Sequence, residues 1–232
     1  MVNNWRKTRR LGGSCLLCDA AATGLLCKDC CSDLPWLTNS CDRCALPLPY
    51  NASCPRCLRR PLPCHVRAAC RYEYPVPLLV QRLKFHGRPG LGAEFARLML
   101  ARIPAHDPSD TCLLPMPLHW RRQLYRGFNQ ALEIARPLAA HLDIPLRVDV
   151  CRRVRATRPQ TDLHGRQRRR NVSGAFRVYP TCRLPAHVIV VDDVMTSGHT
   201  AAALARSLRR AGVRTVTLWA FARAGIQGIK TK

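Results

Sequence analysis

The hydrophobic pattern is clearest toward the end of the chain. Residues 188–191 (VIVV) form a short β-branched run, which is typical of a strand buried on both faces. A helical pattern covers 201–211, and Gly212 is placed to end that helix. The next apolar run, 213–221, predicts another strand. Strand, loop, helix and strand in this order predict a βαβ unit with parallel strands.

The middle of the chain adds further periodic segments. Amphipathic helices are predicted at 78–85 and 90–102, and a third at 128–142 with a kink at Pro137. Alternating or apolar runs predict three more strands, at 71–74, 112–114 and 175–178. These elements predict an α/β fold, in which a parallel sheet is flanked by helices.

Composition indicates the charge of the partners and the cellular compartment in outline. The 232 residues have room for one α/β domain and a smaller module. A formal charge of +24 favours anionic partners such as nucleotides, pyrophosphate or nucleic acid, although an arginine-rich coding bias explains the charge equally well. The basic segment 6–10 is followed by no apolar run of signal-peptide length, and no run approaches the ~18 residues of a membrane span. We therefore expect a cytoplasmic protein.

Eleven of the fourteen cysteines lie between Cys15 and Cys70, and eight of them form four CxxC pairs. Two such turns complete a tetrahedral zinc site, whereas a disulfide framework needs an oxidising compartment. We predict two structural Zn²⁺ sites, paired in sequence order, with a crossed arrangement left open. The expected ligands are Cys15, Cys18, Cys27 and Cys30 for one site, and Cys41, Cys44, Cys54 and Cys57 for the other.

The other cysteines of this region have different interpretations. We interpret Cys31 as a bystander beside a ligand, and Cys64-His65 next to a proline-rich stretch as a linker. The predicted division is a double zinc-ribbon module at 1–66 and the α/β domain at 67–232. The module is expected to be structural or to form a docking surface, and nucleic-acid binding is the more specific alternative.

The loop after 188–191 combines acids with small hydroxyl-bearing residues. Asp192-Asp193 is the one adjacent acidic pair in the chain, and Gly198, shortly before the predicted helix, lets the backbone approach an anion closely. A helix N-terminus offers free N–H groups to an anion, while carboxylates suit ribose hydroxyls or a ligand-borne magnesium ion. The loop therefore predicts a ribose 5-phosphate site; the alternative is that the acids only cap the helix. The phosphate side of this site is predicted to be Thr196, Ser197, Gly198, His199 and Thr200.

Arginines gather in two other segments. After the strand at 112–114, prolines predict an extended loop that places basic groups for a pyrophosphate; the candidates are Pro117, Leu118, His119, Arg122 and Arg126. The stretch 152–170 is expected to be an exposed mobile loop that closes over a polyphosphate, with a solvated surface or a DNA-contacting patch as alternatives. Lys84 is interpreted as a solvated lysine beside an apolar face.

The segment VIVVDDVMTSGHT resembles the thirteen-residue phosphoribosyl pyrophosphate (PRPP) motif of type I phosphoribosyltransferases. The resemblance implies that Asp192 and Asp193 hold the ribose 2- and 3-hydroxyls and that residues 196–200 hold the 5-phosphate. His199 departs from the small residue usual in the motif, and Thr196 stands where the purine-salvage branch has an aspartate base, which argues against that branch.

Further segments resemble the ComF family, and its ComF/GntX subgroup with paired ribbons in particular. They are PMPLHWRRQLYRGFNQ, LKFHG, and the series Arg155, Thr157, Gln160, Leu163, Arg169 and Asn171. The resemblance implies binding of PRPP with Mg²⁺ and a link to competence, the uptake of transforming DNA. The first hypothesis is a phosphoribosyltransferase that transfers the pentosyl group to an acceptor the motifs do not identify. The second is a non-catalytic PRPP sensor, or a partner of the uptake machinery that handles single-stranded DNA.

Overall fold

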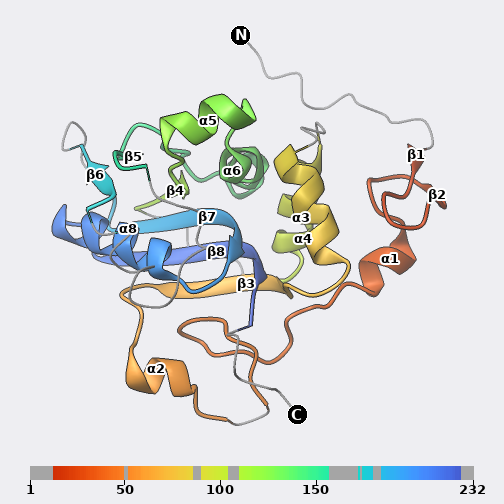
Figure 1. The fold of residues 1–232 in the computed structure, drawn as a ribbon, viewed down its shortest axis with the longest axis horizontal. Coiled ribbons are helices and arrows are strands. Elements are labelled where there is room, and N and C mark those ends of the chain that lie inside the picture. Colours follow the sequence, from red (N-terminus) through yellow and green to blue (C-terminus); the bar gives the residue numbers. More distant parts are fainter. Residues whose placement is uncertain are drawn as a thin grey trace.

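A parallel four-stranded sheet forms the centre of the protein (Figure 1). The computed structural model describes residues 13–49, 52–85, 90–103, 110–156, 172, 174–179 and 184–225. The strand order is β3-β8-β7-β4, and all three pairings are parallel. This confirms the predicted α/β fold. The strands are β3 (His65–Arg71), β4 (Thr111–Pro115), β7 (His187–Met195) and β8 (Thr215–Arg223).

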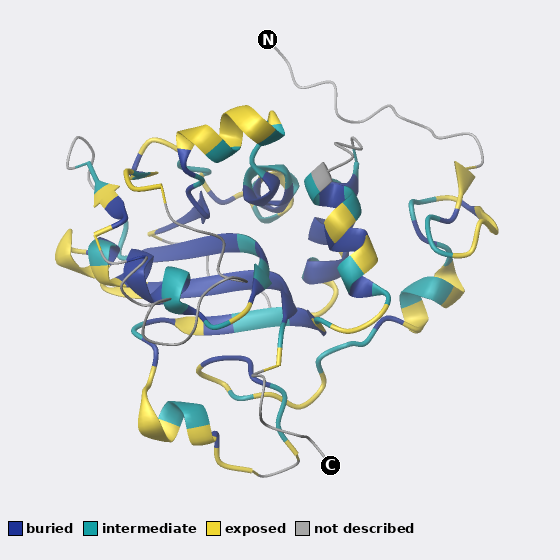
Figure 2. Ribbon diagram, viewed as in Figure 1, coloured by how far each residue is buried: buried dark blue, intermediate teal, exposed yellow. Residues whose placement is uncertain are grey.

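Helices cover both faces of the sheet, so its middle strands are buried (Figure 2). On one face lie α3 (Val76–Phe85), α4 (Leu91–Leu100) and α6 (Gln130–Leu142), and on the other lies α8 (His199–Arg210). The predicted helices at 78–85, 90–102 and 201–211 are thus confirmed to within a few residues. Outside the sheet, β5 (Cys151–Arg153) and β6 (Phe176–Val178) form an antiparallel pair beside α8.

Two hydrophobic clusters lie on opposite faces of the sheet, and each includes one cysteine-rich ribbon. The first ribbon (residues 13–34) contains β1 (Gly13–Ser14), β2 (Ala21–Ala22) and α1 (Lys28–Ser32). The second ribbon (residues 41–62) contains α2 (Pro55–Arg59). The α6-side cluster includes Leu26 and Leu34 of the first ribbon with Leu79, Phe95, Ile134, Ile189 and Val191. The α8-side cluster includes Leu46 and Leu62 of the second ribbon with Met116, Val188, Val190, Met195, Leu204 and Leu218.

The segment that joins the two ribbons runs along the outer edge of β3. Leu37 donates its backbone N–H to the Ala69 oxygen at 2.9 Å, and Arg71 donates to the Pro35 oxygen at 2.7 Å. Residues 35–37 therefore pair antiparallel with the edge strand and cover it.

Two predictions in this region are wrong. The strand predicted at 71–74 is displaced, because β3 ends at Arg71 and is built from the small apolar residues before it. Cys64-His65 is not a linker, since Cys64 is buried and β3 begins at His65. The segment between Pro117 and residue 128, where no helix was predicted, contains α5 (Trp120–Arg126) as a separate helix before α6.

None of the helices within the described ranges is both long and apolar enough to cross a bilayer.

Candidate functional site

The eight predicted cysteine ligands form two clusters of four, in sequence order. In each cluster the sulfur atoms lie within 4.8 Å of one another. The sulfurs of Cys18 and Cys27 are 3.7 Å apart, and those of Cys44 and Cys54 are also 3.7 Å apart. A tetrahedral ion with Zn–S bonds of about 2.3 Å places its ligands roughly 3.8 Å apart, so the geometry fits zinc. The predicted pairing is confirmed: Cys15, Cys18, Cys27 and Cys30 form the first site, and Cys41, Cys44, Cys54 and Cys57 the second.

Local structure orients these thiols. The side chain of Cys27 caps α1 by accepting the Cys30 backbone N–H at 3.4 Å. Cys31 lies outside the cluster of four, which confirms it as a bystander. Its sulfur accepts instead from Arg97 Nη2 at 3.4 Å.

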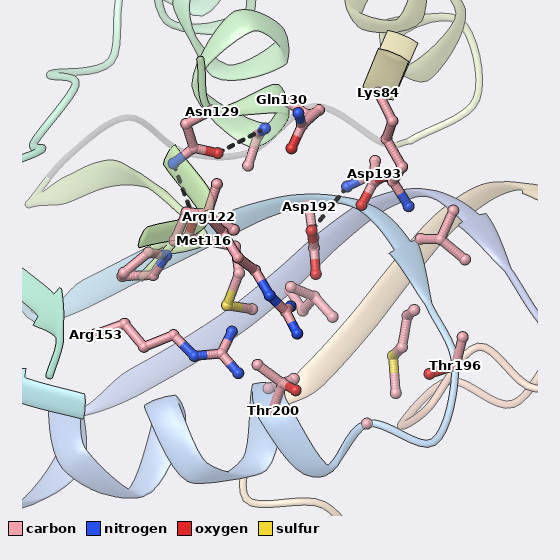
Figure 3. A pocket seen from close by; sticks show the side chains of 18 of the residues that line it. Lys84, Met116, Arg122, Asn129, Gln130, Arg153, Asp192, Asp193, Thr196 and Thr200 are labelled. Atoms are coloured by element: carbon pink, nitrogen blue, oxygen red, sulfur yellow. Dashed lines mark hydrogen bonds and ion pairs between the residues drawn. The ribbon is translucent and has the colours of Figure 1, made fainter. Parts of the chain in front are cut away.

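A cavity of about 220 Å³ opens at the carboxyl ends of β4 and β7, between the N-termini of α6 and α8 (Figure 3). Carboxylates line one side of it and guanidinium groups another. The residues around it are Lys84, Met116, Pro117, Leu118, Arg122, Arg126, Asn129, Gln130, Ala131, Arg153, Asp192, Asp193, Val194, Met195, Thr196, Gly198, Thr200, Ala201 and Leu218.

The acidic pair lies within β7 rather than in a loop, because the strand continues to Met195. Successive side chains of a strand point to opposite faces. Val190 packs in the α8-side cluster and Val191 in the α6-side cluster, so Asp192 faces α8 and Asp193 faces α3. Burial, and then the charge of Asp193, raise the pKa of Asp192 well above its ordinary value. A cation or a hydroxyl donor would therefore be bound favourably by the ionised carboxylate.

Lys84 on α3 is not a solvated lysine, and that interpretation is wrong. Its Nζ lies 2.7 Å from Asp193 Oδ2, with 26% of the lysine and 11% of the aspartate side chain exposed. Figure 3 shows the two groups meeting at the upper rim of the cavity. Opposite charge on a neighbouring helix thus holds Asp193 in place. The sequence signal was the position of Lys84 on the apolar flank of its helix, where a lone solvated charge is unusual.

The turn after β7 brings only part of the predicted phosphate loop to the cavity. Thr196, Gly198 and Thr200 line it, and Gly198 is the N-cap of α8 with a left-handed φ of 70°. Ser197 and His199 are not among the lining residues. Instead, His199 Nδ1 and Ser197 Oγ form a hydrogen bond of 2.8 Å that braces the turn.

The basic side of the cavity comes from α5 and β5. Of the pyrophosphate candidates, Pro117, Leu118, Arg122 and Arg126 line the cavity. His119 does not, because its Nδ1 accepts the Arg121 N–H at 3.3 Å and caps α5.

Arg153 of β5 also lines the cavity, and we did not single it out from the sequence. Burial, together with the charge of the neighbouring Arg122, lowers its pKa to about 10. Burial and Arg126 likewise lower the pKa of Arg122. Like charges gathered in this way favour a polyanionic ligand.

The start of α6 adds amide groups that sequence analysis also missed. Asn129 caps the helix by accepting the Ala131 N–H at 3.0 Å, and its Nδ2 donates to the Met116 oxygen at 3.2 Å. Gln130 Oε1 accepts from Arg126 at 3.0 Å, and its Nε2 is a buried donor without an acceptor among the described residues. An asparagine before a helical run is an N-cap signal, so the helix start could have been predicted here rather than at residue 128.

Several predicted residues lie outside the described ranges. Arg155 is described, whereas Thr157, Gln160, Leu163, Arg169 and Asn171 are not, nor are His86 and Gly87 of LKFHG. Of the basic stretch 152–170, only its first five residues are described.

The cavity can bind a ligand that carries hydroxyl groups at one end and negative charge at the other. Mg²⁺ usually keeps several waters and uses one or two carboxylates plus substrate phosphates. Asp192, on the carboxylate side of the cavity, would suit such an ion when it arrives with a phosphorylated ligand.

Comparison with known proteins identifies the N-terminal part and the family. Residues 11–58 match the family described as double zinc ribbon domain. Over 224 residues the chain is 36% identical to DNA utilization protein YhgH of Salmonella typhimurium. This alignment covers 91% of the present chain and 97% of the relative. It is 34% identical to the Escherichia coli protein of the same name over 79% of this chain and 83% of the relative. The chain is 32% identical to competence protein F of Haemophilus influenzae, and that alignment covers 79% of this chain and 84% of the relative.

Proposed function

Because the chain belongs to the ComF family, which includes the DNA utilization protein YhgH and competence protein F, we propose that it serves DNA utilization through a PRPP-binding pocket. In this proposal it binds PRPP with Mg²⁺ and transfers the phosphoribosyl group to an acceptor. The cytoplasm is the proposed compartment, since the eight zinc-binding thiolates need reducing conditions.

One observation carries the proposal: carboxylates and arginines face one another across a single cavity at the carboxyl end of a parallel sheet. This edge is where open α/β sheets bind ligands. The proposed pose sets the ribose hydroxyls against Asp192 and Asp193. The 5-phosphate then meets the N–H groups at the start of α8, and the pyrophosphate meets Arg122, Arg126 and Arg153.

The chemistry that follows is a displacement at the anomeric carbon. A lone pair of the acceptor forms the new bond, the carbon–oxygen bond to pyrophosphate breaks, and inorganic pyrophosphate leaves with that electron pair. The arginines stabilise the charge on the departing group. Magnesium, when bound, neutralises part of the same charge.

Binding is tested by calorimetry with PRPP and magnesium, using two neighbouring arginines as a matched pair. Arg153 lines the cavity, whereas Arg152 is exposed with its guanidinium 5.7 Å from the Tyr179 ring. Arg153→Met should weaken PRPP affinity by about tenfold or more, since a hydrogen bond to a charged group contributes roughly 1.5–3 kcal/mol. Arg152→Met should leave it within about twofold. Equal affinities for both variants and the parent would refute the proposed pose.

Transfer is tested separately from binding. Pyrophosphate release is measured while purine and pyrimidine bases and ammonia are offered as acceptors. Release that depends on one acceptor supports a transferase. Tight PRPP binding without release for any of them favours the non-catalytic PRPP sensor.

A second candidate function, handling of single-stranded DNA, is favoured by the outer face of α5. Trp120, Leu124 and Tyr125 are 58%, 74% and 83% exposed, and Arg121 lies 5.3 Å from the centre of the Trp120 ring. Exposed aromatic rings among arginines are how sequence-tolerant proteins stack bases and hold phosphates.

This surface is tested with a fluorescent oligonucleotide at several salt concentrations. The double variant Trp120→Ala/Tyr125→Ala should weaken binding by about tenfold or more, because stacking contributes roughly 1–3 kcal/mol per base. Tyr74→Ala is the control, since Tyr74 is 80% exposed but does not belong to α5. Binding that is unchanged in the double variant would remove α5 as the DNA surface.

A further inference from the structure

Two arginines connect the second ribbon with the turn at the start of α8. Arg223, the last residue of β8, is fully buried. Its Nε donates to the oxygen of Cys44, a second-site ligand, at 2.9 Å, and its Nη1 donates to the Thr196 oxygen at 2.7 Å. Arg56, which lies between the ligands Cys54 and Cys57, donates through Nη2 to the Ser197 oxygen.

These contacts fix the direction of the peptide groups in the turn. The C=O and N–H of one trans peptide point in opposite directions. With the Thr196 and Ser197 oxygens held on the ribbon side, the N–H groups of Ser197 and Gly198 point away from the ribbon. These N–H groups lie at the start of α8, where the proposed function places a phosphate.

The packing around Gly198 is equally tight. A Cβ built there would lie 2.6 Å from Met195 Cε, 3.0 Å from Arg56 Nη2 and 3.5 Å from Leu62 Cδ1. Two of these three neighbours belong to the second ribbon. The turn therefore rests directly on that ribbon, and a side chain at this position would meet it.

Charge complements the hydrogen bonds. A zinc ion with four thiolates carries a net charge of −2, and the two guanidinium groups together carry +2. Within the described residues both arginines donate to backbone oxygens, and their Arg56 Nη1 and Arg223 Nη2 atoms are buried without an acceptor there. The zinc–thiolate group thus supplies negative charge close to the buried Arg223 and the half-buried Arg56.

The first ribbon has no comparable relation to the cavity within the described parts of the chain. It packs in the α6-side cluster, whereas Met116, Ala131, Met195 and Ala201 of the cavity wall belong to the α8-side cluster with the second ribbon. Arginines from the helices contact it instead: Arg82 of α3 donates to the Leu16 oxygen, and Arg97 of α4 donates to the Cys31 sulfur.

We propose that Arg56 and Arg223 are positioning residues that make phosphate binding at the α8 turn depend on the second zinc site and not on the first. The inference rests on the proposed function, because PRPP is the ligand that the turn would hold. It assigns the two ribbons different roles: the second supports the ligand site, and the first supports only the fold on the opposite face.

The variants to compare are Arg56→Met, Arg223→Lys and, as the matched control, Arg82→Met. Zinc content is measured first, and the comparison uses protein that retains two ions. Arg56→Met and Arg223→Lys should each weaken PRPP affinity by about tenfold, which is within the usual range of coupling between two sites. Arg82→Met should change it by less than about twofold. Parent-like affinity in both test variants would overturn the proposal.

Hydrogen exchange of the turn separates this inference from the proposed function, because it needs no ligand. Amides of residues 195–200 should exchange faster in Arg56→Met and Arg223→Lys than in the parent, and at the parent rate in Arg82→Met. A parent that does not bind PRPP refutes the proposed function, while unchanged exchange in the test variants refutes the coupling.

The unmodified protein offers a reciprocal test. Coupling of equilibrium affinities is mutual, so PRPP with magnesium should strengthen the retention of zinc against a chelator. At equilibrium with the chelator, PRPP with magnesium should increase the affinity of the protein for one of the two zinc ions and leave its affinity for the other unchanged. An equal effect on both ions, or on neither, would contradict a role confined to the second site.

Discussion

The two adjacent aspartates of β7 should respond in opposite ways when each loses its charge. Asp193→Asn breaks the ion pair with Lys84, whose nitrogen lies 2.7 Å from the carboxylate. Asp192→Asn removes a carboxyl group whose pKa is raised by burial and by the charge of Asp193. That variant therefore loses the repulsion between the two carboxylates rather than an attraction. Sequence considerations alone treat both as residues at a strand end and predict an unchanged or higher melting temperature for each.

The cost of Asp193→Asn follows from the burial of the pair. Breaking a fully buried ion pair costs about 3–5 kcal/mol, and an exposed one contributes about 0–1 kcal/mol. With 26% and 11% of the two side chains exposed, the pair lies between these limits, at about 1–2 kcal/mol. For a chain of this size that lowers the melting temperature by roughly 2–8 °C. Lys84→Met/Asp193→Asn should recover part of the loss, because no unpaired charge remains.

Asp192→Asn should raise the melting temperature, and the gain should depend on pH. A carboxyl whose pKa is raised on folding stabilises the folded state at low pH, and that contribution is lost as pH rises through the raised pKa. Asparagine does not titrate. The variant should therefore melt above the parent at pH 8 and with the parent at pH 4.

Calorimetric melting at several pH values, together with PRPP titration, tests both effects. Each variant should lose about tenfold to hundredfold in PRPP affinity, from a charged hydrogen bond of roughly 1.5–3 kcal/mol. Glu133→Gln, which disrupts an exposed ion pair with Arg136, is the control, and it should change neither the melting temperature nor the PRPP affinity much. Lower melting temperatures for both aspartate variants with unchanged PRPP affinity would show that the acids are structural.

Two further outcomes concern the metal and the turn. Metal analysis of protein purified without added metal should give close to two zinc ions per chain, and a value near one, or native disulfides in mass spectrometry, would contradict two Cys₄ sites. Gly198→Ala should destabilise the protein by at least about 1–2 kcal/mol, because the left-handed φ alone costs that much and the added methyl would meet Met195 Cε at 2.6 Å. Its PRPP affinity should also fall, and a parent-like melting temperature would show that the turn is more adaptable than its packing indicates.

The sequence predicted the elements whose signals are local. The βαβ unit and the four CxxC pairs could be predicted because strand periodicity, helix ends and metal-ligand spacing are properties of neighbouring residues. The position of β3 could not, because its small apolar residues follow a proline-rich stretch and the more aromatic residues 71–74 gave the stronger strand pattern.

Contacts between distant segments were the other limit. Lys84 and Asp193 are separated by more than a hundred residues and meet only after α3 packs on the sheet. Arg153 looked like one of many arginines in a basic stretch, and the short pairing of β5 with β6 is what sets it beside the cavity. Arg56 and Arg223 gave no signal, because their acceptors are backbone oxygens, which any residue type supplies.

The segment 35–37 has a consequence for the protein's behaviour when metal is scarce. It covers the free edge of β3 and is tethered at both ends by a ribbon whose fold depends on zinc. Removing zinc would release the tethers and leave a row of unpaired N–H and C=O groups on an apolar strand, a template for edge-to-edge association. Metal supply would then govern colloidal solubility: chelated protein should form intermolecular β-structure while its central strands remain folded.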